Sequence, residues 1–105
     1  MGWIYLIIAG IFEIGWPLSL KLTQTSENKV LGIILASISM IFSLIFLYIA
    51  QSTIPIGTAY AVWTGIGAVG TLAVGILFFG DSTSIGRLIS AFLIIVGIIG
   101  LKISH

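Results

Sequence analysis

Four apolar stretches, each about as long as a membrane is thick, constrain this 105-residue chain more than any other feature. They run over residues 3–20, 30–50, 57–79 and 85–101. A bilayer core about 30 Å thick needs about 20 apolar residues per helix, so each stretch is long enough to cross it. The sequence therefore predicts an all-α integral membrane protein, in which residues 1–105 form a single domain of four transmembrane helices.

Composition excludes the soluble alternatives. Hydrophobic residues make up 59% of the chain and charged residues only 7%, whereas an ordinary globular domain has about a quarter charged residues. A disordered chain is excluded by the same numbers. The net charge of +1 leaves no basic patch for a nucleic acid, and the absence of cysteine excludes disulfides and thiolate metal sites. We expect a multi-pass protein of the cell membrane, without a cofactor or a metal.

The connections between the stretches are short, which favours antiparallel neighbours with both termini on one side. Counted over the connections and ends, basic residues are in a three-to-one excess on the side away from the termini: Lys21, Lys29 and Arg87 against Lys102. The positive-inside rule then favours termini outside. We expect the first stretch to be retained rather than cleaved as a signal peptide, because an acidic residue and a proline interrupt it and no basic residue precedes it.

Glu13 is the one charged residue deep within a predicted span. It lies about ten residues into the first stretch, or roughly 15 Å along a helix, close to the bilayer midplane. A central carboxylate costs about 2.5–3.5 kcal/mol, so such a residue indicates a functional site. No Lys, Arg or His lies at comparable depth in the other stretches. The carboxylate must therefore take up a proton or bind an incoming cation, and these exclude one another. The structural alternative is a protonated Glu13 hydrogen-bonded to a neighbouring helix.

The residues around Glu13 favour the functional interpretation. Gly10 and Trp16 share its helical face, one leaving space and the other supplying an aromatic ring. Tyr60 and Trp63 repeat the same spacing in the third stretch. Aromatic faces attract cations by about 0.5–2 kcal/mol each, and the Tyr60 hydroxyl can hold a charged carboxylate. The alternative for these aromatic residues is an interfacial belt.

Serines and glycines in the second and third stretches are weaker signals. Ser39 and Ser43 lie within the second span, where a serine often bonds only the carbonyl four residues earlier in its own helix. Gly65, Gly67 and Gly70 cluster in the third stretch. Such a cluster indicates either close packing or a hinge at which the helix bends for alternating access.

The fourth stretch carries small residues but little chemistry. Ala91, Gly97 and Gly100 interrupt an otherwise Ile, Leu and Val sequence. Small residues let membrane helices approach closely, so these three residues indicate packing within one chain or a dimer seam. Four helices are too few to enclose an aqueous chamber, because their side chains fill the centre. A transport function therefore requires an oligomer.

These residues carry a resemblance to the small multidrug resistance family of four-helix transporters, over essentially the whole chain. The most specific matching segments are AGIFEIGWPLSLK at residues 9–21 and IPIGTAYAVWTGIGAVG at residues 54–70. The sequence WTGIG at residues 63–67 and the methionine at position 40 (Met40) resemble the guanidinium-exporting subtype. Pro17 departs from that subtype, which more often has alanine there.

The resemblance implies an antiparallel homodimer of inverted topology, with two copies of Glu13 facing one chamber. Proton and substrate would compete for Glu13, giving proton-coupled export of guanidinium or small substituted guanidinium cations by alternating access. The same resemblance implies a substrate pocket, a hinge in the third helix and a dimer seam in the fourth. The implied pocket residues besides Glu13 and Gly10 are Trp16, Ser43, Tyr60 and Trp63.

Three alternatives stay open at this point. The chain could export a broader range of quaternary ammonium or hydrophobic cations, pair as a heterodimer with a sister chain, or serve as a non-transporting membrane scaffold subunit. An enzyme is not expected, because no nucleophile–base pair is evident and the single histidine is the terminal His105.

Overall fold

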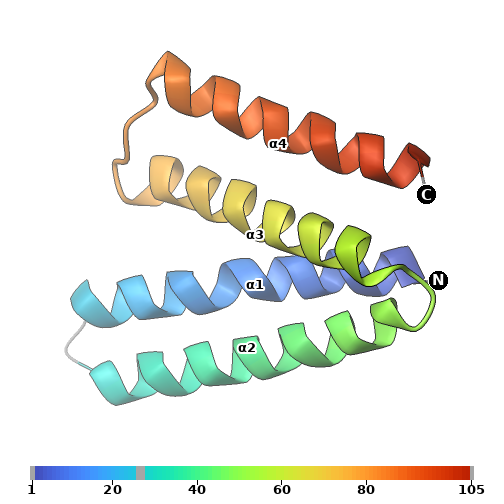
Figure 1. Cartoon of the computed structure of the whole chain (residues 1–105). Helices are drawn as coiled ribbons and strands as arrows, with labels where there is room; N and C mark the ends of the chain where they lie inside the picture. Colours follow the sequence, from blue (N-terminus) through green and yellow to red (C-terminus); the bar gives the residue numbers. More distant parts are fainter. Residues whose placement is uncertain (1, 26–27, 105) are drawn as a thin grey trace.

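The structure is a computed structural model that describes residues 2–25 and 28–104. The regular secondary structure in these residues is helical throughout (Figure 1). The four helices are α1 (Gly2–Thr25), α2 (Lys29–Gln51), α3 (Ile56–Phe78) and α4 (Ile85–Ser104). Each is long and apolar enough to cross a membrane. The predicted class, an all-α membrane protein with four spans, is confirmed.

Helix α1 ends at Thr25 and not near Leu20, where the apolar stretch ends. Hydropathy falls at this point, but helix propensity does not, because Lys21, Leu22 and Gln24 are all good helix formers. The Ser19 hydroxyl donates to the Gly15 carbonyl over 2.9 Å, and the Thr23 hydroxyl donates to the Ser19 carbonyl over 2.8 Å. The part of the predicted connection at residues 26–27 lies outside the described residues. Helix α2 follows Asn28, whose side chain accepts a hydrogen bond from the Leu31 N–H.

Pro17 lies inside α1 without ending it. A proline has no backbone N–H, so the helical hydrogen bond to the carbonyl four residues earlier cannot form. That carbonyl belongs to Glu13. The backbone of α1 is therefore less completely bonded beside the central carboxylate than elsewhere along the span.

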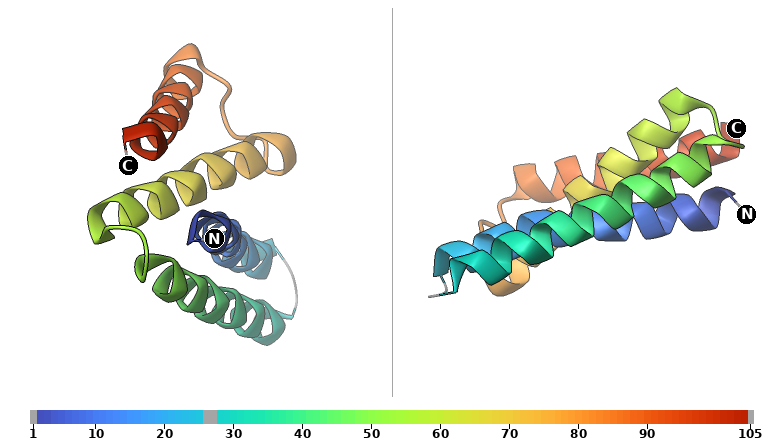
Figure 2. Two further views of the ribbon diagram at one scale, coloured as in Figure 1. Left: turned by 90° about the vertical axis from the view of Figure 1, so that its right-hand side faces the viewer. Right: turned by 90° about the horizontal axis from the view of Figure 1, so that it is seen from below.

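Helix α1 lies between α2 and α3, and α4 lies on the outer side of α3 (Figures 1 and 2). The start of α1 and the end of α4 are at the same end of the molecule (Figure 1). There the Lys102 ammonium lies 5.7 Å from the centre of the Trp3 ring. This contact suits the membrane interface, where amphipathic aromatic rings and basic side chains concentrate.

The hydrophobic core is small and occupies the end of the molecule that holds the start of α1 and the end of α2. Its buried members are Leu6, Ala9, Leu47, Ala50, Ile54, Ala59 and Val62. Stacked rings extend the contact between α1 and α2, with the Phe12 centroid 5.5 Å from that of Phe42 and 6.0 Å from that of Phe46. In contrast, none of the described α4 residues is buried. The single chain thus leaves most of α4 open to lipid or to another protein.

The segment after α3 turns back onto that helix. Gly80 has a φ of 70°, in the left-handed region that glycine adopts without strain. The Asp81 N–H then donates to the Gly75 carbonyl over 3.0 Å. A side chain at Gly75 would collide with the Asp81 carboxylate, so this glycine permits the close return of the chain. The turn holds Asp81 against the end of α3.

Candidate functional site

The central carboxylate of α1 is held by its own helix. The Trp16 indole Nε1 donates a hydrogen bond to Glu13 Oε1 over 2.6 Å, one turn along α1. Both side chains are half-buried. The predicted helical face is therefore realised as a direct contact. The indole is a neutral donor, so it stabilises the carboxylate without supplying the positive charge that an acid in hydrocarbon requires.

Gly67 of α3 gives Glu13 its place between the helices. A Cβ at Gly67 would lie 3.2 Å from the Cβ of Glu13 and closer still to its Cγ. The glycine itself is buried. The Glu13 side chain thus lies against the bare backbone of α3. In this conformation Gly67, one of the three predicted hinge glycines, is a packing position.

A cavity of about 450 Å³ opens beside Glu13. This volume is within the range of about 300–1,000 Å³ that is typical of small-molecule sites. Residues from α1, α3, the following turn and the start of α4 line it. They are Glu13, Trp16, Pro17, Thr64, Gly67, Ala68, Thr71, Leu72, Asp81 and Arg87. The cavity therefore combines two carboxylates, the guanidinium of Arg87, an aromatic ring and two hydroxyl groups with an apolar wall.

Two charged residues that line the cavity, Asp81 and Arg87, were not predicted for the site. The sequence places Asp81 and Arg87 on either side of the start of the fourth helix, where solvent or interfacial anchoring accounts for them. In the structure they line the same cavity as Glu13, and Arg87 Nη2 lies 3.8 Å from Asp81 Oδ2. The turn at Gly80 brings Asp81 back toward α1 and α3. The local sequence offers no signal for this, because the approach depends on tertiary packing.

The hydroxyl of Ser43 joins three helices. Ser43 is fully buried, and its Oγ donates to the Ala9 carbonyl over 2.8 Å while accepting the Trp63 indole N–H over 2.8 Å. Ser39 makes a similar contact, donating to the Phe12 carbonyl over 2.7 Å. The interpretation that these serines bond only within their own helix is therefore wrong. Their partners on α1, the carbonyls of Ala9 and Phe12, both precede Glu13 in that helix.

The aromatic pair of α3 is not brought to Glu13 within one chain. Tyr60 is 57% exposed, and its ring centroid lies 5.5 Å from that of Trp63. Neither residue lines the cavity beside Glu13. Among the hydrogen bonds of residues 2–25 and 28–104, none joins Tyr60 to the carboxylate. The predicted contribution of Ser43, Tyr60 and Trp63 to a substrate pocket stays a prediction.

The other predicted pocket and hinge glycines lie at helix contacts. A Cβ at Gly10 would meet Ile66, and a Cβ at Gly70 would meet Ile14, so these glycines bring α1 and α3 together. Gly65 lies in the same way against isoleucines of α4. Because each of these glycines lacks a side chain, the two helices can approach closely at its position. Their predicted role in bending α3 stays a prediction.

Two of the three residues of the predicted dimer seam lie on the open face of α4. Ala91 is half-buried, whereas Gly97 and Gly100 are exposed. A Cβ at either glycine would meet nothing within 4 Å in this chain. Packing inside one subunit therefore does not account for these two glycines.

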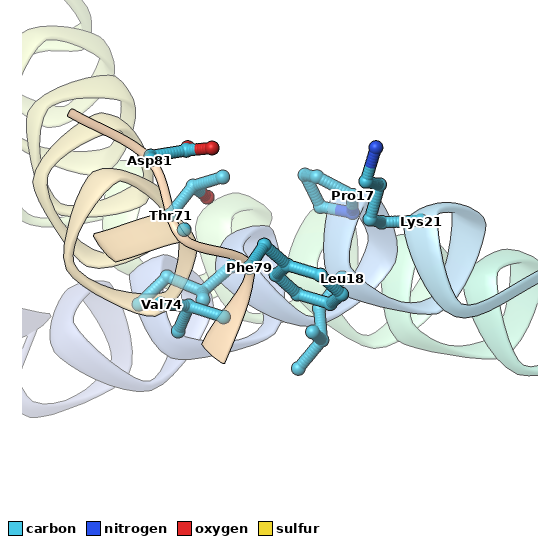
Figure 3. Close-up of a pocket in the computed structure, with 9 residues that line it drawn as sticks. Pro17, Leu18, Lys21, Thr71, Val74, Phe79 and Asp81 are labelled. Atoms are coloured by element: carbon cyan, nitrogen blue, oxygen red, sulfur yellow. The ribbon is translucent and has the colours of Figure 1, made fainter. Parts of the chain in front are cut away.

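A second cavity, of about 250 Å³, adjoins the turn after α3 (Figure 3). Pro17, Thr71 and Asp81 line this cavity as well as the one beside Glu13. Lys21 of α1 is also part of its wall. No group of three metal-ligating side chains occurs among the residues that the structure describes.

Comparison with known proteins adds an independent line of evidence. The family model described as Small Multidrug Resistance protein matches residues 1–94. A protein of Citrobacter freundii named guanidinium exporter is 51% identical over 104 residues, which cover 99% of this chain and 98% of that protein. Proteins of the same name from Salmonella typhimurium strain LT2 and Yersinia pseudotuberculosis are 49% and 45% identical, also over 104 residues and 99% of this chain. They cover 98% and 99% of those relatives.

Proposed function

Because this chain belongs to the Small Multidrug Resistance protein family, we propose that it exports guanidinium or small substituted guanidinium cations in exchange for protons. It is a multi-pass protein of the cell membrane. Relatives named guanidinium exporter, about half identical to it along nearly the whole chain, support the choice of cation. Since those relatives are named as exporters, we infer a transporter and not an enzyme.

One observation carries the proposal: the Glu13 carboxylate lies mid-helix on a cavity wall with the neutral Trp16 indole as its hydrogen-bond donor. A carboxylate in this position is stabilised by a proton or by a bound cation. The two ligands compete for the same oxygen atoms. Binding of substrate on one side of the membrane and of protons on the other then couples the two flows in opposite directions.

The cavity chemistry supports a guanidinium-type cation. A guanidinium is planar and presents several N–H donors in a fixed arrangement that matches a carboxylate. Besides the carboxylate of Glu13, the cavity holds the hydroxyls of Thr64 and Thr71, which accept N–H donors. A quaternary ammonium has no N–H group and would leave these acceptors unused. Its affinity would rest on charge and aromatic contact.

We infer that the working unit is an antiparallel homodimer. Helix α4 buries none of its described residues, and the open space at Gly97 and Gly100 suits a close helix contact. Tyr60 is exposed in the single chain, so a second copy of opposite orientation would complete a chamber around two Glu13 carboxylates. The glycines of α3 would permit the bending that alternates access. A heterodimer with a sister chain is the competing arrangement.

The proposal is tested with the purified protein in liposomes under a proton gradient. We expect guanidinium to be accumulated against its concentration gradient and to drive proton movement. Glu13→Gln should abolish both guanidinium binding and coupled transport, whereas Ser37→Ala should leave them unchanged. Ser37 is the matched control, because it is exposed and bonds only the carbonyl of Ile33 in its own helix.

Three outcomes separate the proposal from its rivals. Uphill guanidinium transport by the Glu13→Gln variant would show that the exchange mechanism is wrong. Equal or better transport of tetraalkylammonium ions would favour the broader multidrug function. A purified protein that moves no protons on addition of any cation would favour a scaffold subunit.

A further inference from the structure

Two acidic side chains share the cavity that holds the proposed transport site. The chain has three acidic residues in all, and the two that the structure describes, Glu13 and Asp81, both line this cavity. Glu13 belongs to the middle of α1, whereas Asp81 belongs to the turn between α3 and α4. The first therefore lies deep in the span and the second near its end. A cation entering from that end meets Asp81 on the way to Glu13.

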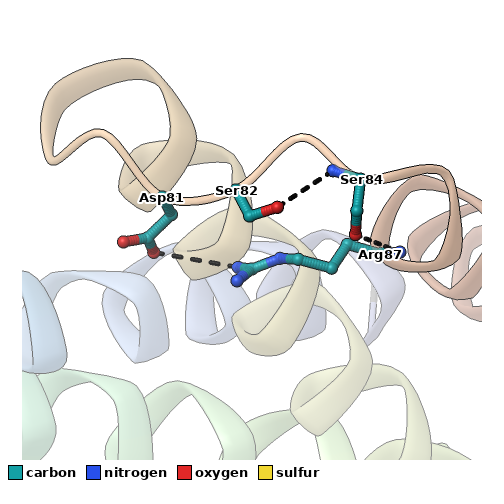
Figure 4. A network of polar contacts seen from close by, with 4 residues as sticks. All are labelled: Asp81, Ser82, Ser84 and Arg87. Carbon is teal, nitrogen blue, oxygen red and sulfur yellow. Dashed lines mark hydrogen bonds and ion pairs between the residues drawn. The ribbon is translucent and has the colours of Figure 1, made fainter.

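Asp81 is paired with a guanidinium that the protein itself supplies (Figure 4). Arg87 Nη2 lies 3.8 Å from Asp81 Oδ2, which is an ion-pair distance but longer than a hydrogen bond. The Arg87 side chain is 37% exposed and that of Asp81 is 46% exposed. A single, partly exposed contact of this kind is weak. A free guanidinium with a better approach to the carboxylate can therefore replace the arginine.

The arginine is fixed near the cavity but is incompletely bonded. The Ser84 N–H donates to the Ser82 hydroxyl over 3.2 Å, and the Arg87 N–H donates to the Ser84 hydroxyl over 3.4 Å (Figure 4). These contacts hold the backbone at the start of α4. The Nε atom of Arg87 is buried and has no hydrogen-bond partner among the described residues. The side chain is thus placed beside Asp81 without the bidentate geometry that makes an arginine–carboxylate pair strong.

Two positive side chains, Lys21 and Arg87, surround Asp81 at this end of the cavity, so its negative charge matters to an approaching cation. Lys21 lines the adjoining cavity together with Asp81 (Figure 3), and Arg87 lines the cavity of Glu13. Without Asp81, a cation approaching here would meet two positive side chains. Asp81 is the one described acidic residue that offsets them at this end of the spans.

We propose that Asp81 is an outer binding subsite for the guanidinium cation on its path to or from Glu13, and that Arg87 is a built-in competitor for that subsite. The inference rests on the proposed function. Arg87 carries the same chemical group as the proposed cargo, so the observed pair represents the subsite occupied by a tethered guanidinium. Release of Arg87 from Asp81 accompanies loading of the free cation.

The test compares the two members of the pair in guanidinium–proton exchange by the full-length protein in liposomes. Asp81→Asn should raise the guanidinium KM about fivefold, and Arg87→Gln should lower it by a similar factor, as befits a contact of this exposure. The rate at saturating guanidinium should change little in both variants. A merely structural ion pair predicts the opposite pattern, in which both variants lose function in the same direction.

Two controls keep the result interpretable. Ser90→Ala removes an exposed side-chain hydrogen bond within α4 without changing charge, and it should leave the KM unaltered. High salt screens exposed charges, so it should reduce the difference between the two charge variants. If Asp81→Asn and Arg87→Gln both raise the KM, or both leave it unchanged, while the wild-type protein exchanges normally, the outer subsite is refuted and the proposed function stands. A wild-type protein that exchanged no guanidinium for protons would overturn the proposed function and this inference with it.

Discussion

The Trp16 indole N–H lies 2.6 Å from Glu13 Oε1, so the proposed transport carboxylate carries its own neutral hydrogen-bond donor from one turn along the same helix. A donor to one carboxylate oxygen leaves the other oxygen for a ligand. It also holds the side chain in one orientation while the cavity beside it fills or empties.

Replacing Trp16 by phenylalanine should keep the ring but remove the donor. A hydrogen bond to a charged group contributes about 1.5–3 kcal/mol, so guanidinium affinity at a fixed pH should fall about tenfold or more. Binding titrations with guanidinium at that pH measure the effect. Trp3→Phe, at the membrane interface, is the control, and an unchanged guanidinium affinity for Trp16→Phe would contradict the assigned role.

Gly67→Ala should displace Glu13. The added methyl group would collide with the Glu13 side chain, and overpacking of this kind costs about 1–3 kcal/mol. We expect guanidinium transport to fall at least about tenfold, because the carboxylate or α3 must shift. Liposome transport measures the effect. Gly57→Ala, in the same helix but with open space at the Cβ position, should behave as wild type; equal loss in both variants would point to helix propensity instead.

Ser43→Ala should destabilise the fold more than it changes substrate preference. The substitution leaves the indole N–H of the half-buried Trp63 without its acceptor and the carbonyl of the buried Ala9 without its donor from α2. An unsatisfied buried group costs about 1–3 kcal/mol, which should appear as a lower Tm in detergent, followed by tryptophan fluorescence. The exposed Ser37→Ala variant should keep the wild-type Tm. A Tm unchanged by Ser43→Ala would mean that the three-helix contact contributes little.

Gly97→Leu should weaken the inferred dimer. In one chain a side chain at this position meets open space, so the subunit itself should fold normally. If the position lies in a close helix contact between subunits, the bulky group should reduce chemical cross-linking into dimers. Gly86→Leu, also in open space near the start of α4, should cross-link as wild type does. Undiminished cross-linking of Gly97→Leu would place the seam on another face.

The fold was predictable because the bilayer fixes how long an apolar helix must be. The four spans follow from hydropathy alone, yet the end of α1 does not, because the polar residues after Leu20 stay helical through Thr25. Hydropathy indicates the membrane boundary, whereas the helix boundary depends on backbone propensity, which stays favourable at Lys21, Leu22 and Gln24. Chain length and polarity therefore predict architecture better than they predict termini.

The site was only partly predictable. The isolation of Glu13 and its pairing with Trp16 follow from helical spacing within one segment. The approach of Asp81 and Arg87 to the same cavity depends on how the turn at Gly80 folds back, which no local pattern indicates. The bonds of Ser39 and Ser43 to α1 were missed for the same reason, since a hydroxyl can reach its own helix or a neighbour with equal ease.

The bonds of Ser39 and Ser43 to the α1 backbone have a mechanical consequence. Together with the stacked rings of Phe12, Phe42 and Phe46, they tie α1 to α2 in the turn that precedes the carboxylate. Parting these two helices would break the bonds of Ser39 and Ser43 to α1, whereas sliding α3 past them would break the bond of Trp63 to Ser43. We therefore expect α1, which carries Glu13, to move together with α2 as one rigid unit. Helix α3, which meets α1 through glycines, should be the element that shifts relative to that pair.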